Sequence, residues 1–326
     1  MKVGIVGCGG VGKKRASALG DSVLVACADV VRERADALAR SAPGAPQALV
    51  DWRAVVERPD VDVVIVATPH DRLAEVTLAA IAAGKHVLVE KPAARRADEL
   101  DPVIAAAARA GVLVRVGFNH RHHPALRKAK ALVAEGAVGD LVYVRGRYGH
   151  GGRPGYEREW RAQPELSGGG ELVDQGVHLI DLARWFLGDF ERVQGLARTF
   201  FWEMPVEDNG FLLLETAARQ VAFLHASWTE WKNLFSFEIF GRLGKLEVTG
   251  LGGSYGTERL AYYRMRPELG PPETTMWEYP MADTSWDAEF AEFTEDIRLN
   301  RQPGASLRDA QAALAVVQRV YEASRA

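Results

Sequence analysis

The sequence has few of the features that mark secreted, membrane-spanning or nucleic-acid-binding proteins. Only two of its 326 residues are cysteines, Cys8 and Cys27, which excludes a disulfide framework and favours a reducing compartment. No apolar run approaches the roughly 20 residues of a membrane-spanning helix, and the glycine-rich start MKVGIVGCGG does not fit a signal-peptide core. A net charge of −3 gives no electrostatic case for binding nucleic acid or an anionic membrane. We therefore expect a cytoplasmic protein.

The first 118 residues alternate short, β-branched apolar runs with alanine-rich helical stretches. The apolar runs cover residues 2–7, 23–29, 61–68, 86–92 and 112–118. Continuous apolar strands separated by helices indicate a parallel sheet that is covered on both faces. We predict an α/β fold in which residues 1–118 form a Rossmann domain with a doubly wound parallel sheet.

The pattern changes after residue 118, where strands follow one another without intervening helices. Helical periodicity covers 124–136, 171–187, 286–300 and 306–326, and strand patterns cover 191–202, 209–229, 234–250 and 260–266. This order predicts an α+β domain over 119–326 with a large, mostly antiparallel sheet, and the C-terminal helix is free to pack back on the first domain. Large side chains alternate in LFSFEIFG and TTMWEYP, so one face of the sheet is too apolar for water. We expect this face to form a homodimer or homotetramer.

The segment GCGGVG (7–12) carries the clearest chemical motif. Gly7, Gly9 and Gly12 fit G-x-G-x-x-G, which follows a strand and opens a helix, and Asp29 ends the next strand. This is the dinucleotide-binding fingerprint in its structural context, in which backbone N–H groups approach the pyrophosphate and Asp29 accepts from ribose hydroxyls. The residues predicted to bind the cofactor here are Gly7, Gly9, Gly10, Val11, Gly12 and Asp29.

Two further interpretations of this region stay open. Asp29 could be only a turn residue at a strand end. Its carboxylate repels a 2′-phosphate and so favours NAD, whereas Arg32 could pair with such a phosphate, which keeps NADP as the alternative.

A second motif is the stripe of polar residues in ELVDQGVHLIDLARWFL (171–187). Asp174, His178 and Asp181 lie at i, i+4 and i+7, within roughly 60° of one another on an α-helix. Nearly every other direction around this helix is apolar, which predicts a buried helix. The stripe is either structural, with Asp174 in the first helical turn and His178 hydrogen-bonded in the core, or part of a functional site.

These segments, together with GKHVLVEKP (84–92) and GFNHRHHPA (117–125), resemble the glucose–fructose oxidoreductase, inositol dehydrogenase and MocA family. The resemblance covers essentially the whole chain. It implies an NAD-dependent dehydrogenase of sugars or cyclitols. The catalytic residues implied are Lys91 of the EKP tripeptide, Asp174 and His178.

The resemblance also assigns cofactor and substrate contacts. It places Thr68, Pro69, Glu90, Lys91 and Asn119 against the cofactor, and Trp160 and Arg161 match a WR pair found near cofactor or substrate. Arg153 and Tyr156 belong to a polar, aromatic and glycine-rich run (147–170), which is either an ordinary loop or a lid over substrate. Asp181 could orient His178, bind a sugar hydroxyl or cap a neighbouring element. The predicted substrate residues are Arg121, Arg153, Tyr156, Trp160, Arg161 and Asp181.

The residue types fit alcohol oxidation. NAD accepts the hydride, His178 titrates in the range needed of a general base, and Lys91 can stabilise a developing alkoxide. Later segments such as MPVEDNG resemble a branch associated with sugar and polysaccharide biosynthesis, which points towards a sugar nucleotide. Close spacing and the lack of companion ligands argue against a metal site at His120, His122 and His123.

Two alternative functions remain. A glycosidase or epimerase with transient internal redox would use the same residues without net NADH formation. A non-catalytic dinucleotide-binding regulator would have no need of Lys91, Asp174 and His178 together.

Overall fold

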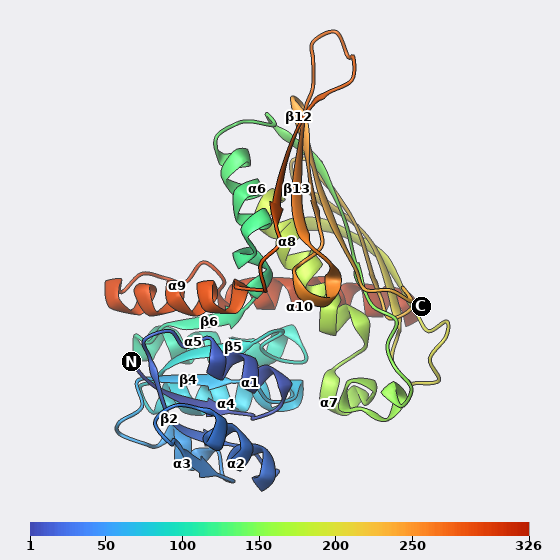
Figure 1. Cartoon of the computed structure of the whole chain (residues 1–326). Helices are drawn as coiled ribbons and strands as arrows, with labels where there is room; N and C mark the ends of the chain where they lie inside the picture. The colour runs from blue at the N-terminus through green and yellow to red at the C-terminus, as the bar shows by residue number, and fades with distance from the viewer. Residues whose placement is uncertain (326) are drawn as a thin grey trace. The chain divides into compact units, whose positions relative to one another are not determined.

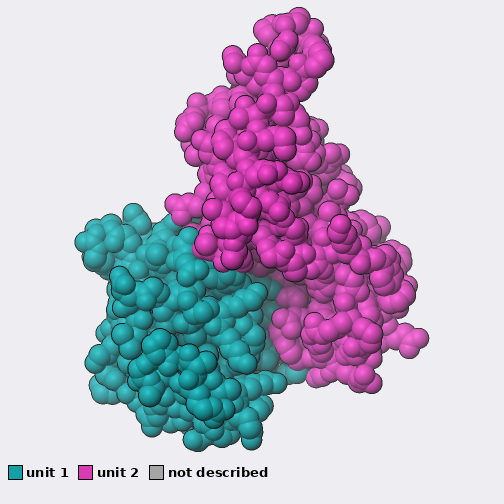
Figure 2. All heavy atoms as spheres, viewed as in Figure 1, with its two compact units in different colours: residues 1–118, 165–168, 286–311 teal, residues 119–164, 169–285, 312–326 magenta. Residues whose placement is uncertain are grey.

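The computed structural model describes residues 1–325, which divide into two compact units (Figures 1 and 2). The first unit contains residues 1–118, 165–168 and 286–311. The second contains residues 119–164 and 169–285 and the described chain from residue 312 onward. Each unit has its own sheet, and each is described separately below.

The first unit is built on a six-stranded, fully parallel sheet, which confirms the predicted Rossmann architecture. The strand order is β3-β2-β1-β4-β5-β6, so the order reverses between β1 and β4. The strands are β1 (Lys2–Val6), β2 (Val23–Ala28), β3 (Gln47–Leu49), β4 (Val63–Val66), β5 (His86–Glu90) and β6 (Val114–Gly117). β3 has only three residues and no apolar run, and the sequence pattern did not indicate it.

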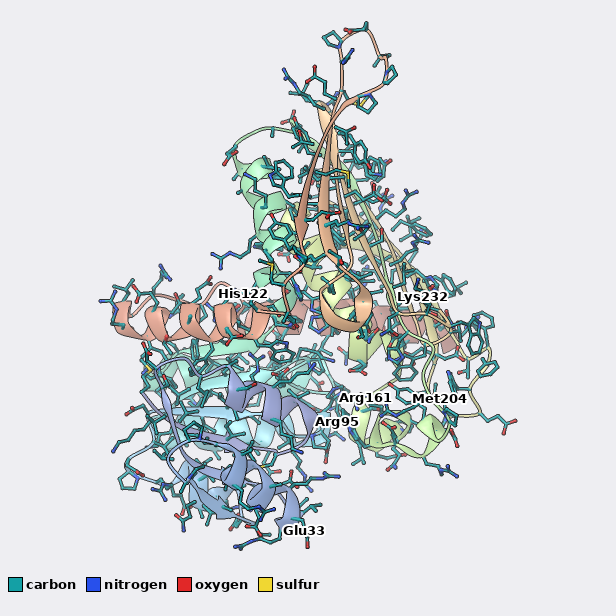
Figure 3. All side chains as sticks on the ribbon, in the orientation of Figure 1. Glu33, Arg95, His122, Arg161, Met204 and Lys232 are labelled. Carbon is teal, nitrogen blue, oxygen red and sulfur yellow. The ribbon has the colours of Figure 1, made fainter. Side chains whose placement is uncertain are left out.

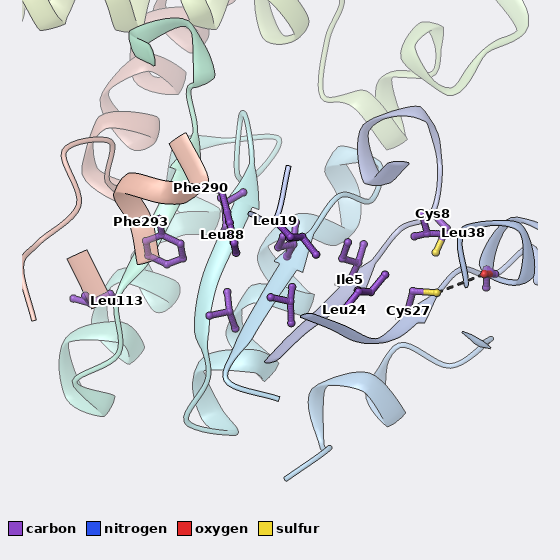
Figure 4. Packing of buried hydrophobic residues seen from close by; sticks show 14 residues of the cluster. Ile5, Cys8, Leu19, Leu24, Cys27, Leu38, Leu88, Leu113, Phe290 and Phe293 are labelled. Carbon is purple, nitrogen blue, oxygen red and sulfur yellow. Dashed lines mark hydrogen bonds between the residues drawn. The ribbon is translucent and has the colours of Figure 1, made fainter. Parts of the chain in front are cut away.

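Helices surround this sheet and complete its core. They are α1 (Gly10–Ser17), α2 (Arg32–Ser41), α3 (Arg53–Val56), α4 (His70–Ala82), α5 (Asp101–Ala110) and α9 (Ser285–Leu299). Although α9 is remote in sequence, its Phe290 and Phe293 join Ile5, Leu88 and Leu113 in one buried hydrophobic cluster (Figure 4). The α9 segment is therefore an integral part of the Rossmann unit.

The second unit is built on an eight-stranded sheet with the order β14-β13-β12-β11-β7-β10-β9-β8. All neighbouring strands are antiparallel except β7 and β10, so the predicted mostly antiparallel sheet is confirmed. The strands are β7 (Leu141–Gly149), β8 (Phe190–Arg198), β9 (Asn209–Thr216), β10 (Val221–Ser227), β11 (Leu234–Gly241), β12 (Gly244–Thr249), β13 (Glu258–Arg264) and β14 (Glu273–Tyr279). β7 lies in the middle of the sheet but was not predicted.

Helices pack on one face and along one edge of this sheet (Figure 1). α6 (Pro124–Ala134) contacts β12, β13 and β14, and α8 (Val177–Leu187) contacts β7 and β10. The later part of α10 (Leu307–Arg325) follows the edge strand β8, where Ser324 Oγ accepts a hydrogen bond from the Ala197 N–H at 3.0 Å. The predicted helix over 306–326 therefore corresponds to α10, and Ala326 lies outside the described residues.

The predicted continuous helix over 171–187 needs a correction. Residues Leu172–Gly176 form a π-helical turn, here called η5, and the α-helix proper begins only at Val177. A π turn holds more residues than an α turn and is frequent at functional sites. Asp174 therefore does not keep the α-helical spacing to His178 on which the predicted stripe rests.

The remaining helices are short. They are η1 (Ala97–Leu100), η2 (Asn119–His122), η3 (Tyr156–Arg158), η4 (Trp160–Ala162), α7 (Pro164–Ser167) and η6 (Gly253–Tyr255). Across residues 1–325, no helix has both the length and the apolar character required to cross a membrane.

Candidate active site

The glycine turn between β1 and α1 has the geometry of a phosphate cradle. Gly7 has a φ of +97°, and a Cβ there would come within 2.3 Å of the Ala67 carbonyl oxygen. A Cβ on Gly12 would lie 1.9 Å from the Gly7 carbonyl oxygen. By contrast, a Cβ on Gly9 or Gly10 would meet no atom within 4 Å, so bare backbone faces open space at the start of α1. This arrangement fits an anionic pyrophosphate, which the helix N-terminus would stabilise.

Asp29 follows the end of β2 and is held in place through both carboxylate oxygens. Oδ2 accepts from the Cys8 N–H at 2.8 Å, and Oδ1 accepts from the Val31 N–H at 2.9 Å. A carboxylate has about four acceptor positions, so ribose hydroxyls could still donate to Asp29. Val30 is 82% exposed beside it, which adds an apolar surface that the sequence analysis missed. Arg32 instead pairs with Asp36 at 3.0 Å on the surface of α2.

Thr68 and Pro69 follow the end of β4, next to the glycine turn. The β1–β4 junction is the switch point of the sheet, where ligands of doubly wound folds bind. Thr68 is half-buried and Pro69 is exposed. His70 begins α4, and its Nδ1 lies 2.8 Å from the Ser167 carbonyl oxygen. His70 was not predicted as a site residue, although it directly follows the Thr-Pro pair.

Lys91 lies in a tight turn at the end of β5. The turn is closed by a hydrogen bond from the Ala93 N–H to the Glu90 carbonyl oxygen at 2.9 Å, and Ala93 has a φ of +70°. Such a conformation is costly for a residue with a Cβ and occurs mostly where surrounding structure imposes it. Lys91 is half-buried. The turn thus fixes the backbone from which the Lys91 ammonium extends.

Glu90 is positioned by a buried ion pair. Its Oε1 accepts from Arg15 Nε at 2.6 Å, and Glu90 as a whole is only 6% exposed. Gly117 on β6 packs against the pair, since a Cβ there would lie 2.6 Å from Arg15 Nη2. Arg15 therefore holds the Glu90 side chain, which is the one predicted to contact the nicotinamide.

In the second unit, Asp174 lies in the π turn and pairs with Arg161. Arg161 Nε donates to Asp174 Oδ2 at 2.8 Å, and Figure 3 marks Arg161 in the segment that precedes this turn. The Asp174 charge raises the pKa of Arg161 further above its usual value. The positive charge of Arg161 is therefore balanced by Asp174, which precedes the predicted catalytic His178 by four residues.

His178 lies in the first turn of α8, buried against aromatic rings. Its imidazole stacks on that of His120, with ring centroids 3.8 Å apart and planes inclined by 22°. Tyr148 of β7 is edge-on to His120 at 5.1 Å, and the pKa of Tyr148 is raised well above its usual value by burial. Tyr255 lies 5.2 Å from Tyr148. His120, Tyr148 and Tyr255 were not predicted as site residues.

Two of the predicted substrate residues pair with each other. Arg121 donates to Asp181 through Nε at 2.8 Å and through Nη2 at 2.5 Å, and the two residues are 7% and 1% exposed. Asn119, at the start of η2, donates from Nδ2 to Ser285 Oγ at 2.9 Å. The charges of Arg121 and Asp181 thus compensate each other within the unit.

The remaining predicted substrate residues lie on the segment between β7 and the π turn. Arg153 is exposed and pairs with Glu159 at 2.6 Å. Tyr156 is 3% exposed and packs in a small core cluster with Val206 and Trp228. Trp160 is half-buried, with the Arg161 guanidinium 4.5 Å from its ring centroid. Arg161 therefore contacts Asp174 directly. Tyr156 contributes to packing, and its pKa is raised by burial and by the charge of Asp174.

A buried carboxylate holds the start of the π turn. Glu207 accepts hydrogen bonds from the Gly170 and Leu172 N–H groups, each at 3.0 Å, and from the Tyr321 hydroxyl at 2.6 Å. Burial raises the pKa of Glu207 above its usual value. A Cβ on Gly170 would lie 1.9 Å from the Glu207 carbonyl oxygen, so this approach requires glycine. Gly170 and Glu207 are 37 residues apart, so the sequence pattern alone did not predict this contact.

His123 takes part in a different contact. Its Nδ1 lies 2.8 Å from Glu258 Oε2, and both residues are almost fully buried. The other Glu258 oxygen accepts from the Ala125 N–H at the start of α6. This pair fixes the beginning of α6.

The fold and these residues define an oxidoreductase with a Rossmann-type dinucleotide-binding unit. The family model "Oxidoreductase family, NAD-binding Rossmann fold" matches residues 1–118, and the model "GFO/IDH/MocA C-terminal domain" matches residues 126–247. The chain belongs to the GFO/IDH/MocA family.

Individual relatives fit this assignment. Levoglucosan dehydrogenase from Pseudarthrobacter phenanthrenivorans is 37% identical over 162 residues, which are 49% of this chain and 42% of that protein. Inositol 2-dehydrogenase 2 from Saccharopolyspora erythraea is 32% identical over 229 residues, 66% of this chain and 63% of that protein. The matched segments thus span less than two thirds of either relative. A solved structure of levoglucosan dehydrogenase in complex with NADH superposes with a TM-score of 0.90, at 25% identity, and covers 100% of this chain and 97% of that one.

Proposed function

We propose that this protein is an NAD-dependent dehydrogenase that oxidises a secondary hydroxyl of an uncharged sugar or cyclitol. One observation carries the proposal. The chain combines a glycine cradle suited to a dinucleotide in its Rossmann unit with a buried His178 and a buried Asp174 that pairs with Arg161 in its second unit. The names of the relatives, levoglucosan and inositol dehydrogenases, support the same reaction class.

The residues that would hold NAD lie along the carboxyl ends of the parallel strands. The cradle at Gly9 and Gly10 takes the pyrophosphate, and Asp29 accepts from the adenosine ribose. Thr68 and Lys91 then lie on the nicotinamide side of the switch point. When bound, NAD supplies the hydride acceptor.

The remaining chemistry belongs to the side chains. His178 takes the hydroxyl proton as general base, a role typically worth about 10²–10⁴-fold in rate. Lys91 donates a hydrogen bond to the developing alkoxide. Asp174, oriented by Arg161, accepts from a neighbouring substrate hydroxyl. His120 packs against the face of the His178 imidazole and restricts its rotation.

The charge distribution favours an uncharged substrate over a sugar nucleotide. Arg121, Arg153 and Arg161 are the arginines among the predicted substrate residues, and a phosphorylated substrate would need them. Each of them pairs with a carboxylate of its own unit, at 2.5, 2.6 and 2.8 Å respectively. A phosphate would have to displace these carboxylates or be held beside them. Paired guanidiniums and carboxylates suit the hydroxyls of a neutral polyol instead.

A substrate screen tests the proposal. Anhydrosugars, free aldoses and inositols are compared with UDP- and dTDP-sugars, each with NAD, and NADH formation is followed by absorbance. We expect NADH with at least one neutral compound and a kcat/KM at least tenfold lower with every sugar nucleotide. Preference for a sugar nucleotide would refute the substrate class, and conversion of substrate without net NADH would indicate internal redox.

A further inference from the structure

A buried charged cluster lies at the carboxyl end of β5, and the mechanism above does not use all of it. The Arg15 guanidinium on α1 donates to Glu90 through Nε at 2.6 Å and to Glu289 of α9 through Nη1 at 2.6 Å. The side chains of Arg15 and Glu289 are fully buried, and that of Glu90 is 8% exposed. The Trp286 ring lies 4.4 Å from the guanidinium on another side.

The cluster contains one cation and two carboxylates, so it carries a net negative charge when both acids are ionised. The positive charge of Arg115 on β6 also acts on Glu289. Arg115 is itself bound to Glu292 at 2.9 Å and to Asp296 at 2.5 Å, so the buried charges here still include more carboxylates than guanidiniums. A charge in a dry interior acts over a longer range than the same charge in water. A structural ion pair between Arg15 and Glu90 would be complete without Glu289.

The cluster lies at the end of β5, on the side of the sheet where the nicotinamide half of the cofactor is expected. A doubly wound sheet binds the two halves of a dinucleotide on opposite sides of its switch point. Here Asp29 and β2 lie on one side of β1, so the nicotinamide half belongs over β4, β5 and β6. Glu90 is the last residue of β5 and directly precedes Lys91. The nicotinamide ring is cationic in NAD⁺ and neutral in NADH, so a nearby negative charge distinguishes the two forms.

We propose that Glu289 biases the cofactor site towards the oxidised form, because its carboxylate makes the Arg15–Glu90–Glu289 cluster net negative beneath the nicotinamide position. Glu289 is then a residue that sets cofactor preference without touching the cofactor. The bias favours binding of NAD⁺ before the reaction and release of NADH after it, which suits an enzyme that works in the direction of oxidation. This inference rests on the proposed NAD-dependent function.

Glu289→Gln tests the inference, because it removes one charge and keeps both the shape and an oxygen that Arg15 can reach. Dissociation constants of NAD⁺ and NADH are measured by calorimetry on the full chain at pH 8, on the alkaline side because burial raises the pKa of Glu289 above its usual value. We expect the ratio Kd(NADH)/Kd(NAD⁺) to fall by about three- to tenfold, the size of effect that one buried unit charge exerts through an effective dielectric constant near 20. Glu292→Gln is the matched control on the same helix, since its side chain is 33% exposed; its ratio should stay within about twofold of wild type.

The outcomes separate the inference from the proposed function. If a folded Glu289→Gln variant keeps the wild-type ratio, or weakens both forms equally, Glu289 is only structural and the inference is wrong. If the wild-type protein binds neither NAD⁺ nor NADH, the proposed function itself fails. Should Glu289→Gln not fold, Glu90→Gln removes one charge from the same Arg15 cluster, and an unchanged ratio in that variant overturns the inference equally.

Discussion

The imidazoles of His120 and His178 lie face to face, with their centroids 3.8 Å apart. One ring comes from the segment just after the last Rossmann strand and the other from α8, about 60 residues later. The contact fixes the plane of the proposed general base, which must point one nitrogen at the substrate hydroxyl. Stacking of this kind depends on a flat ring at position 120 and not on its charge.

We expect His178→Ala to lower kcat by about 10²-fold or more while the Kd of NAD changes less than about threefold, because the base is lost and the Rossmann unit is untouched. His120→Ala should lower kcat by about tenfold, and His120→Phe should restore most of it by replacing the stacked ring. Steady-state kinetics and calorimetry provide both quantities. A His178→Ala enzyme within about threefold of wild type in kcat would exclude the general-base role.

Lys91→Ala should reduce turnover far more than cofactor binding. Its ammonium extends from the turn between Glu90 and Ala93, and we assign it to the alkoxide that forms during oxidation. The expected loss is about 10²-fold in kcat with a Kd for NAD within about threefold of wild type. If activity instead returns at saturating NAD, Lys91 is a cofactor ligand and not a catalytic residue.

Asp29→Ala should weaken NAD binding by about tenfold, because the variant loses two acceptors for the ribose hydroxyls. It should also reduce the preference for NAD over NADP, because the carboxylate that repels a 2′-phosphate is gone. Arg32→Ala is the control. Since Arg32 already pairs with Asp36 on the surface, its loss should change the NAD/NADP ratio less than about twofold. Binding constants for both cofactors decide the matter, and a wild-type preference for NADP would show that Arg32 outweighs Asp29.

Glu207 should make the second unit less stable as the pH rises. Burial raises its folded-state pKa above the ordinary value of 4.5, so the folded protein holds this proton more tightly than the unfolded chain. Its stabilising contribution is therefore complete below pH 4.5 and is lost as the pH rises through the folded pKa. Glu207→Gln removes this titration. The Tm of the variant minus the Tm of wild type should therefore be a few degrees larger at pH 7 than at pH 5.

Thermal unfolding followed by circular dichroism at several pH values measures this difference. The exposed Glu203 lies on the same loop, and Glu203→Gln should leave the pH dependence of Tm as in wild type. A difference between Glu207→Gln and wild type that stays constant with pH would show that the carboxylate does not titrate differently on folding.

The Rossmann unit was predictable because every step of its formation is local in sequence. Its strands are continuous apolar runs, and the glycines of the turn after β1 indicate both a tight bend and an exposed backbone. β7 was missed for an equally physical reason. Gly146 points into the core, where a Cβ would lie 3.0 Å from Phe237, and Arg145 points outward to pair with Glu238 on the next strand. The strand therefore shows only a four-residue apolar run, LVYV, which is interrupted by the polar and glycine residues RGR before the strand ends.

The candidate site was predictable as residue types but not as partners. The stripe of Asp174, His178 and Asp181 reads as one surface of an α-helix, yet the π turn separates Asp174 from the other two. The three residues contact Arg161, His120 and Arg121 respectively. Pairing of side chains so distant in sequence depends on tertiary packing, for which a single sequence has no signal.

The open face of the eight-stranded sheet should join two copies of this chain. Helices α6 and α8 pack on the opposite face, and adjacent strands here present Leu196, Leu213 and Phe223, which are 50%, 47% and 48% exposed. Contiguous apolar side chains of this size on a regular sheet are typical of a subunit interface. Light scattering at micromolar concentration should therefore give two or four times the 35.7 kDa of one chain.

Leu213→Glu combined with Phe223→Glu should give the mass of a single chain, whereas the control Leu78→Glu on α4, 37% exposed, should leave the assembly intact. A wild-type mass near 35.7 kDa would reject this interface, because the exposed leucines and phenylalanine would then face water in the native protein.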